Sequence, residues 1–270
     1  MAAGTGPAEL LDLATAAAQR AADLLVDGFG RARASVETKS TATDMVSEMD
    51  RASERLIVST LLAARPDDGV MAEEGGATPG TSGLRWVIDP LDGTTNYLYG
   101  HPGWAVSIAA EDEAGVVAGV VIDPMHHDVF SATRGGGAQR NGEPIACSSL
   151  DDLGTALLAT GFGYAAERRR GQAQVLVELL PRIRDIRRMG AAAVDLCSVA
   201  CGRVDGYFER GLAWWDLAAG GLVAAESGAL LSAIGGGPAG PDAGSIVAAG
   251  PGLFGTLREL LSSLGAHNVP

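Results

Sequence analysis

Several features that would assign this chain to a class are scarce in its 270 residues. It has three cysteines (Cys147, Cys197 and Cys201), too few for a disulfide framework. Cys197 and Cys201 have no further Cys or His nearby to complete a zinc site, so we interpret them as small buried thiols. No apolar run approaches the roughly 20 residues that cross a bilayer, and residues 1–7 lack the regions of a signal peptide. We therefore expect a soluble, cytoplasmic protein without a membrane partner.

Positive charge is also scarce. The chain has 33 acidic residues against 20 basic ones, a net charge of −13. A field of that sign repels nucleic acids and anionic membranes, so we expect no nucleic-acid partner. It would also repel a phosphate-bearing substrate unless a bound cation reversed the local potential. Ordinary globular proportions, 47% hydrophobic and 20% charged residues, exclude wholesale disorder.

The first part of the chain mixes helical and extended patterns. Apolar residues recur at helical spacing over residues 8–28 and 46–63. Short apolar runs at 70–72 and 85–88 predict strands, and residues 77–84 are predicted to form a loop. Three further strands are then expected, joined by short turns in an antiparallel meander. Their ranges are 104–110, 116–123 and 128–132.

After residue 150 strands alternate with helices. The predicted strands are 156–160, 183–187, 204–209, 230–233 and 245–249, and the predicted helices are 165–180, 190–202, 214–227 and 252–264. The change of pattern predicts two lobes: an N-terminal α+β lobe over residues 1–150, carrying the metal-binding motifs, and a C-terminal α/β lobe over 151–270, completing the site. The arginine groups at 168–170 and 182–188 are interpreted as solvated faces.

The strongest chemical signal follows the strand at 85–88, in the segment Asp-Pro-Leu-Asp-Gly-Thr-Thr-Asn that begins at Asp89. Asp89 and Asp92 are three residues apart, so their carboxylates repel unless a cation lies between them. Thr94 can open a helix whose first N–H groups, with that of Gly93, would bind an anion. A metal beside an anion site is what phosphoryl transfer needs. The structural alternative is a strand-to-helix turn with an aspartate as N-cap.

One other enzymatic interpretation fails on spacing. Haloacid-dehalogenase-like phosphatases also carry two aspartates after an apolar strand, but two residues apart, with the first acting as nucleophile. In this chain the aspartates are three apart, and the residue two positions after Asp89 is Leu91, which has no carboxylate, so the required spacing is absent.

Other charged residues extend the candidate site. Glu73 and Glu74 end a predicted strand, where adjacent side chains alternate, so one should face the site and the other point away. Asp216 opens a helix, where the dipole favours its charge, and Glu209 ends a strand. Lys39 is the one lysine among the 20 basic residues, which indicates that a compact ammonium is wanted there rather than a guanidinium.

Together these segments resemble the inositol monophosphatase family, within the fructose-bisphosphatase-like superfamily of Mg²⁺-dependent, lithium-sensitive phosphatases. The matching blocks occur in the family's order over residues 8–264: Lys39-Ser40 with 44–50, Glu73-Glu74-Gly75, 89–96, Arg187 with 190–193, and 215–220. The resemblance implies a fold on the border of the α+β and α/β classes, a layered αβαβα sandwich, and a homodimer.

The resemblance also implies a metal site of two to three Mg²⁺ ions. Glu73, Asp89 and the main-chain carbonyl of Leu91 are expected to bind the first ion. Asp89, Asp92 and Asp216 are expected to bind the second, and Glu73 with waters a weaker third. Oxygen ligands with room for water agree with Mg²⁺ rather than zinc.

The remaining roles implied by the resemblance concern the water and the substrate. Thr94, paired with Asp50, is expected to orient the attacking water together with Glu73, so these three are the candidate catalytic residues. Lys39 is a possible further site residue. The implied substrate-binding residues are Asp92, Gly93, Thr94, Ala192 and Glu209.

Three positions depart from the family pattern. Ala191 replaces a Ser or Thr that often follows the glycine, residues 41–43 lack the usual proline, and Ser47 replaces a threonine. None is an expected metal ligand, but the hydroxyl missing at Ala191 leaves the substrate open. The leading hypothesis is hydrolysis of inositol monophosphates. Histidinol phosphate, fructose 1,6-bisphosphate, adenosine 3′,5′-bisphosphate and NADP are rival substrates. A regulatory binding protein of this fold is the alternative from another class; the retained carboxylates argue against it.

Overall fold

The computed structural model describes residues 6–29, 37–38, 45–46 and 48–269. Lys39 and the departures at 41–43 and Ser47 lie outside the described residues, so the prediction made for Lys39 stays a prediction.

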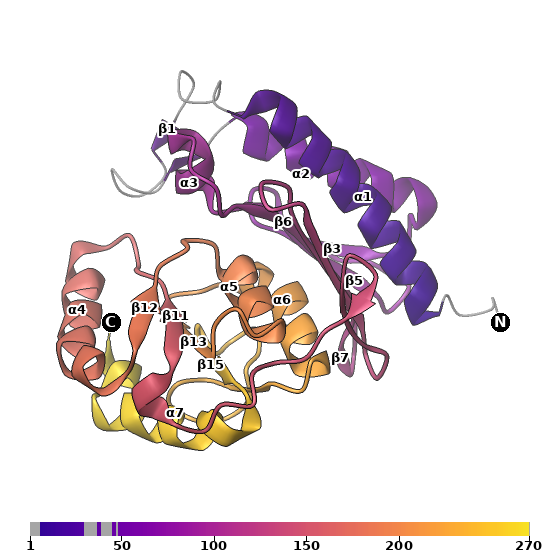
Figure 1. Cartoon of the computed structure of the whole chain (residues 1–270). Coiled ribbons are helices and arrows are strands. Elements are labelled where there is room, and N and C mark those ends of the chain that lie inside the picture. The colour runs from indigo at the N-terminus through magenta and orange to yellow at the C-terminus, as the bar shows by residue number, and fades with distance from the viewer. Residues whose placement is uncertain (1–5, 30–36, 39–44, 47, 270) are drawn as a thin grey trace.

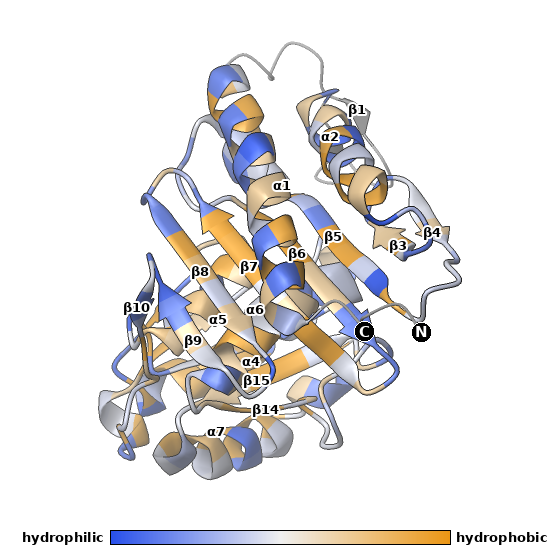
Figure 2. Cartoon of the chain, turned by 90° about the vertical axis from the view of Figure 1, so that its right-hand side faces the viewer, coloured by the Kyte–Doolittle hydropathy of each residue, from blue (hydrophilic) through white to orange (hydrophobic). Residues whose placement is uncertain are grey.

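Two long helices form the first layer. α1 (Pro7–Gly28) and α2 (Glu48–Ala64) lie across one face of a large sheet (Figures 1 and 2). Proline at the first position suits the start of α1, and its small buried residues, among them Ala14, Ala17 and Ala21, allow close packing on the sheet. The helix predicted over 8–28 is confirmed, and the one predicted over 46–63 begins at Glu48 instead.

The second layer is an eight-stranded sheet with the order β10-β9-β8-β7-β6-β5-β3-β4. The predicted meander is confirmed, because β6, β7 and β8 pair antiparallel. The loop predicted over 77–84 is wrong at its start, where a short exposed strand, β4, pairs with β3. β4 has no apolar alternation that could have revealed it. The strands are β3 (Gly69–Ala72), β4 (Gly76–Thr78), β5 (Arg85–Asp92), β6 (Ala105–Asp112), β7 (Gly115–Asp123), β8 (Asp128–Thr133), β9 (Gly137–Arg140) and β10 (Glu143–Pro144). A separate pair joins β1 (Glu37–Thr38) and β2 (Met45–Val46).

Helices α5 (Ala192–Ala200) and α6 (Trp214–Glu226) form the middle layer, between the two sheets (Figure 1). All nine residues of α5 are buried. Gly220 lets the two helices approach, since a Cβ there would lie 3.0 Å from Leu196 Cβ. One apolar cluster joins both sheets through these helices, from Val87 on β5 to Ala248 on β15.

The fourth layer is a five-stranded mixed sheet with the order β12-β11-β13-β15-β14. Its side chains alternate, so that Ile246 and Ala248 pack toward α5 and α6, while Val247 and Ala249 pack toward the outer helices. The strands are β11 (Leu157–Thr160), β12 (Asp185–Arg187), β13 (Gly206–Arg210), β14 (Leu230–Ser232) and β15 (Ser245–Ala249).

Helices α4 (Ala166–Leu179) and α7 (Pro251–Ser263) form the outer layer (Figure 1). The layers therefore follow the order αβαβα, and the predicted sandwich is confirmed. The division into lobes at residue 150 stays a prediction; the chain passes from the large to the small sheet near that point. Within the described residues, no helix is both long enough and apolar enough to span a bilayer.

Candidate active site

The site begins where β5 becomes irregular. The strand continues past Ile88 to Asp92, but its register with β6 shifts between Asp89 and Asp92. Pro90 cannot donate to the ladder, and its carbonyl accepts a hydrogen bond from the buried Ser53 hydroxyl (2.9 Å). Residues three apart on a regular strand point to opposite faces; the shift instead lets Asp89 and Asp92 line the same pocket.

Gly93 makes the turn from this strand into α3 (Thr94–Tyr99). Its φ is +88°, and a Cβ there would lie 2.8 Å from the carbonyl oxygen of Gly103, so no side chain fits. The buried Thr94 opens the helix, as predicted. Its hydroxyl lies 3.1 Å from the Leu91 carbonyl oxygen and 3.4 Å from Asp50 Oδ2. Thr94 therefore lies beside Asp50, which comes from the first turn of α2.

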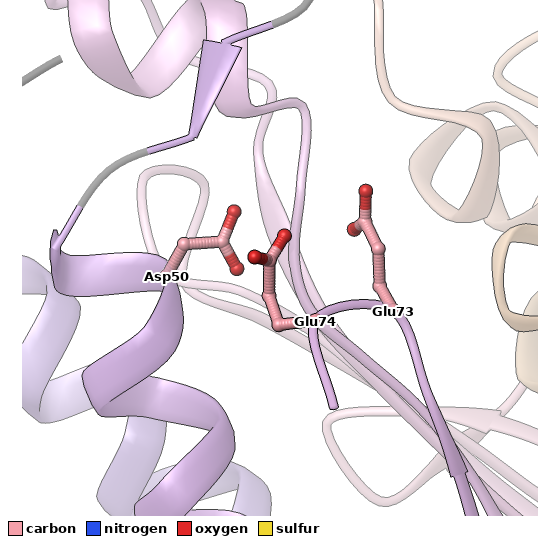
Figure 3. A group of neighbouring side chains, drawn as sticks. All are labelled: Asp50, Glu73 and Glu74. Atoms are coloured by element: carbon pink, nitrogen blue, oxygen red, sulfur yellow. The ribbon is translucent and has the colours of Figure 1, made fainter. Parts of the chain in front are cut away.

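A first acidic group combines Asp50, Glu73 and Glu74, each offering an oxygen within 4.8 Å of the others (Figure 3). Of the two glutamates, Glu73 lines the pocket that also holds Asp89 and Glu74 does not, although both offer an oxygen to this first group. Both follow the end of β3 at Ala72, in a turn where strand alternation no longer holds. The N–H of Glu74 donates to Glu54 (2.8 Å), which fixes this turn against α2.

A second acidic group combines Asp89, Asp92 and Asp216, whose oxygens also lie within 4.8 Å of one another. Asp216 is in the first turn of α6 and accepts a hydrogen bond from the N–H of Ala213 (2.6 Å), so the helix start holds its carboxylate. The structure thus brings together three carboxylates from two elements more than 120 residues apart in sequence.

Asp92 also connects the large sheet to the middle layer of helices. Its two carboxylate oxygens accept hydrogen bonds from the N–H groups of Ala192 (3.1 Å) and Ala193 (2.7 Å). These are the first residues of α5, whose own N-cap, Ala191, has no side-chain oxygen. An aspartate therefore does cap a helix here, but that helix is α5 rather than α3, and the contact places Ala192 at the site.

The electrostatics of the second group are unfavourable for three anions. Burial raises the pKa of Asp89 well above its usual range, and four neighbouring carboxylates, beginning with Glu73, raise it further. Burial raises the pKa of Asp92 to about 7, although the N–H groups of α5 lower it. Burial and then the charge of Asp92 raise the pKa of Asp216. A divalent cation would reverse this repulsion, and the all-oxygen donor set fits a hard ion.

An open pocket of about 910 Å³ joins the second group to the small sheet. At that side Glu209 accepts a hydrogen bond from the Tyr207 hydroxyl (2.8 Å). Burial raises the pKa of Glu209, while Tyr207 and the charge of Arg188 lower it. The predicted site residues that line this pocket are Glu73, Asp89, Leu91, Asp92, Gly93, Thr94, Ala192, Glu209 and Asp216. Asp50 reaches the site through Thr94.

Comparison with known proteins agrees with this geometry. The model of the inositol monophosphatase family matches residues 7–265. The chain belongs to the inositol monophosphatase family. Membership confirms the predicted family and the predicted inositol monophosphatase-type phosphoric monoester hydrolase.

Relatives within the family carry two kinds of name. The inositol-1-monophosphatase SuhB of Mycobacterium tuberculosis (strain ATCC 25618 / H37Rv) is 45% identical over 254 residues, covering 90% of this chain and 84% of the relative. The Nus factor SuhB of Escherichia coli (strain K12) is 39% identical over 259 residues, covering 94% and 97%. The crystal structure of the extragenic suppressor protein suhB from Bartonella henselae superposes with a TM-score of 0.89 at 36% identity, covering 93% and 98%.

Three residues that line the pocket were not predicted from the sequence. Arg168, Arg188 and Phe162 line it. The interpretation of the arginine groups as solvated faces is therefore wrong for the half-buried Arg168, whereas Arg188 lines the pocket and is exposed. The sequence feature that could have indicated them is a nearby glycine, Gly163 for Arg168 and Gly190 for Arg188. Each glycine leaves space that the arginine side chain occupies.

Proposed function

We propose that this protein is a Mg²⁺-dependent phosphomonoesterase that hydrolyses inositol monophosphates, with inositol 1-phosphate as its principal substrate. The observation that carries the proposal is the convergence of Asp89, Asp92 and Asp216 beside Thr94 at the start of α3. Three carboxylates that repel one another, two of them on buried residues, would form a stable group with a divalent cation bound, and a phosphate ester would then bind to that cation.

The chain's own oxygens would hold two to three ions. Asp89, Asp92 and Asp216 would hold one, and Glu73, Asp89 and the Leu91 carbonyl another, with Glu73 also serving a weaker third. When bound, Mg²⁺ supplies positive charge that lowers the pKa of water and stabilises the leaving oxygen. The Leu91 carbonyl oxygen lies 3.1 Å from the Thr94 hydroxyl, so one proposed ligand lies beside the water-positioning residue.

The water would be oriented by Thr94 and Glu73. The Thr94 hydroxyl donates toward Asp50 or Leu91, which leaves its oxygen free to accept a hydrogen bond from the water. The water oxygen forms a new bond to phosphorus as the ester bond on the opposite side breaks. The N–H groups of Gly93 and Thr94 hold the phosphate at the start of α3.

The alcohol part of the substrate would bind toward the small sheet. Tyr207 donates to one oxygen of Glu209, which fixes the carboxylate and leaves further lone pairs for polyol hydroxyls. Asp92 and Ala192 complete this contact, because Asp92 holds the start of α5 in place. The homodimer and the lithium sensitivity, both implied by the resemblance, stay predictions, and so does the cytoplasmic location expected from the sequence.

A second candidate role is raised by the relative named Nus factor SuhB: a binding function that does not use catalysis. A panel of phosphate esters, assayed with Mg²⁺ and with a chelator, separates the two. We expect Mg²⁺-dependent release of phosphate, fastest from inositol 1-phosphate and slower from histidinol phosphate or NADP. If no ester is hydrolysed at any Mg²⁺ concentration, the enzymatic proposal fails and the binding role replaces it.

A further inference from the structure

A buried carboxylate of the large sheet lies outside both acidic groups. Glu111, near the end of β6, is 7% exposed and does not line the active-site pocket. Strand alternation places it on the same face as Ala109, which belongs to the apolar cluster around α5 and α6. A charge buried against apolar side chains is unfavourable unless it is paired and hydrogen-bonded, so the partners of Glu111 indicate its role.

Each oxygen of the Glu111 carboxylate has a partner from a different segment. Arg85 lies opposite Glu111 on β5 and donates to Oε1 in an ion pair. The indole N–H of Trp214 donates to Oε2 at 2.8 Å. Arg85 therefore holds the carboxylate on the sheet, while the second oxygen binds the first residue of α6, 103 positions further along the chain.

The start of α6 has no capping side chain before it. Its N-cap residue, Ala213, has no side-chain oxygen with which to cap the helix. The N–H of Ala213 instead donates to Asp216 Oδ2, so the carboxylate of Asp216 follows the backbone next to Trp214. Trp215 and Asp216 line the active-site pocket, whereas the Trp214 indole reaches Glu111. The Glu111–Trp214 hydrogen bond thus attaches the turn that carries Asp216 to the large sheet.

The first turn of α6 meets β5 at two points on one face of the strand. Arg85 and Asp89 are four residues apart, so their side chains share a face and their Cα atoms are about 13 Å apart. At Asp89, the carboxylate of Asp216 lies within 4.8 Å, and the two carboxylates repel. At Arg85, the hydrogen bond between Glu111 and Trp214 holds the same turn. This bond therefore opposes the repulsion that pushes Asp216 away.

We propose that Glu111 is a positioning residue of the metal site, which holds α6 where Asp216 can bind an ion together with Asp89. The inference rests on the proposed function, which makes Asp216 a ligand of Mg²⁺. Neither Glu111 nor its partner Trp214 would touch the ion or the substrate. Because their bond keeps the ligands close before an ion binds, its loss should weaken ion binding and leave the chemical step nearly unchanged.

The test measures Mg²⁺ binding without substrate, from urea unfolding of the full chain at increasing Mg²⁺, which yields an apparent dissociation constant. Glu111→Met removes the acceptor and keeps the length of the side chain, whereas Glu111→Gln keeps an acceptor oxygen. Trp214→Phe removes the donor and keeps an aromatic ring. Glu113→Met is the matched control for charge, because Glu113 is exposed in the turn between β6 and β7.

We expect Glu111→Met and Trp214→Phe each to raise the apparent dissociation constant for Mg²⁺ by about tenfold or somewhat less, since the bond acts on Asp216 through the helix. Both remove the same bond, so the double variant should lose about as much as either single variant. Glu111→Gln should lose less, and Glu113→Met should match the wild type. In phosphate release, the Mg²⁺ concentration for half-maximal rate should rise in proportion, while kcat at saturating Mg²⁺ stays within about twofold.

Three results would overturn the inference. The first is an apparent dissociation constant within twofold of wild type in folded Glu111→Met and Trp214→Phe, even where both are less stable in a chelator; Glu111 would then serve stability alone. The second is an equal loss in Glu113→Met, which would assign the effect to net charge. The third is additive losses in the double variant. If Glu111→Met does not fold, Trp214→Phe decides.

Failure of the proposed function is distinguished by the wild type. A wild-type chain that Mg²⁺ does not stabilise and that releases no phosphate would refute the proposed function and the inference together. A wild type that Mg²⁺ stabilises and activates, with Glu111→Met and Trp214→Phe of unchanged affinity, would refute the inference alone.

Discussion

Replacing Asp92 by Asn tests whether the acidic group is built for a cation. Asp92 is buried, lies within 4.8 Å of Asp89 and Asp216, and accepts hydrogen bonds from the first two N–H groups of α5. The substitution removes the charge and keeps the shape. Its effect on the free energy of unfolding is therefore the difference between relieved repulsion and a weakened helix cap.

The free energy gained by removing the repelling charge can be calculated from the pKa of Asp92. The fold raises this pKa from 3.8 to about 7, so the folded protein holds the proton more tightly than the unfolded chain does. A raised carboxyl pKa means that its contribution to stability is present at low pH and is lost as pH rises from about 4 to about 7. The shift corresponds to about 4 kcal/mol, of which roughly 3 kcal/mol falls between pH 5 and pH 8.

The stability lost by weakening the cap of α5 is smaller than the stability gained by relieving the repulsion. An asparagine oxygen still accepts from one α5 N–H, but its NH₂ group faces the other, which is a loss of about 1 kcal/mol. Without metal, Asp92→Asn should therefore be more stable than the wild type at pH 8 by about 2 to 3 kcal/mol. The difference should narrow as pH falls toward 5. With Mg²⁺, the two proteins should become nearly equal in stability, or the wild type should become the more stable one. The wild type alone keeps all the carboxylates proposed to bind the ion.

Urea unfolding of both proteins, at pH 5 to 8 in a chelator and again in excess Mg²⁺, measures this directly. A wild type whose stability in chelator does not fall with rising pH more than that of Asp92→Asn would refute the reasoning. So would a variant that Mg²⁺ stabilises as much as it stabilises the wild type, because Asp92 would then contribute nothing to the cation site.

Three further substitutions test the proposed roles one at a time. Asp89→Asn should abolish Mg²⁺-dependent turnover with the fold intact by circular dichroism, since it removes the charged carboxylate that we propose as a ligand of two ions; activity within tenfold of wild type would contradict this. Thr94→Ala should lower kcat strongly with little change in the Mg²⁺ requirement, and a preserved kcat at much higher Mg²⁺ would move Thr94 out of the water-positioning role. Glu209→Gln should reduce kcat/KM for inositol 1-phosphate by roughly 10- to 100-fold and leave a small aryl phosphate nearly unaffected, because the aryl ester has no polyol hydroxyls. Equal losses on the two esters would instead place Glu209 in the metal site or the fold.

The sequence predicted the local elements and the residue types of the site well. The apolar spacing of α1, the meander from β6 to β8 and the helix opened by Thr94 each follow from neighbours along the chain. The acidic residues could be selected because carboxylates at the ends of strands and helices have few structural reasons to gather there.

What escaped prediction depends on contacts between distant segments or on irregular backbone. The cap that Asp92 provides to α5 joins residues 100 apart, so no local pattern reveals it. Glu73 and Glu74 both offer an oxygen to the group with Asp50 because β3 has already ended, although Glu73 alone of the two lines the pocket. Arg168 was assigned to the surface because a run of arginines is usually solvated. In the structure its side chain packs against Gly163 and Gly211, which lie on two separate segments of the chain.

The measurement that tests the central claim most directly is a Mg²⁺ titration of phosphate release from inositol 1-phosphate. The wild-type chain should show no release in a chelator and a rate that rises with Mg²⁺, while Asp89→Asn should stay flat over the same range. Release by the wild type that is the same with Mg²⁺ and with a chelator would contradict the account, and so would no release at any Mg²⁺ concentration.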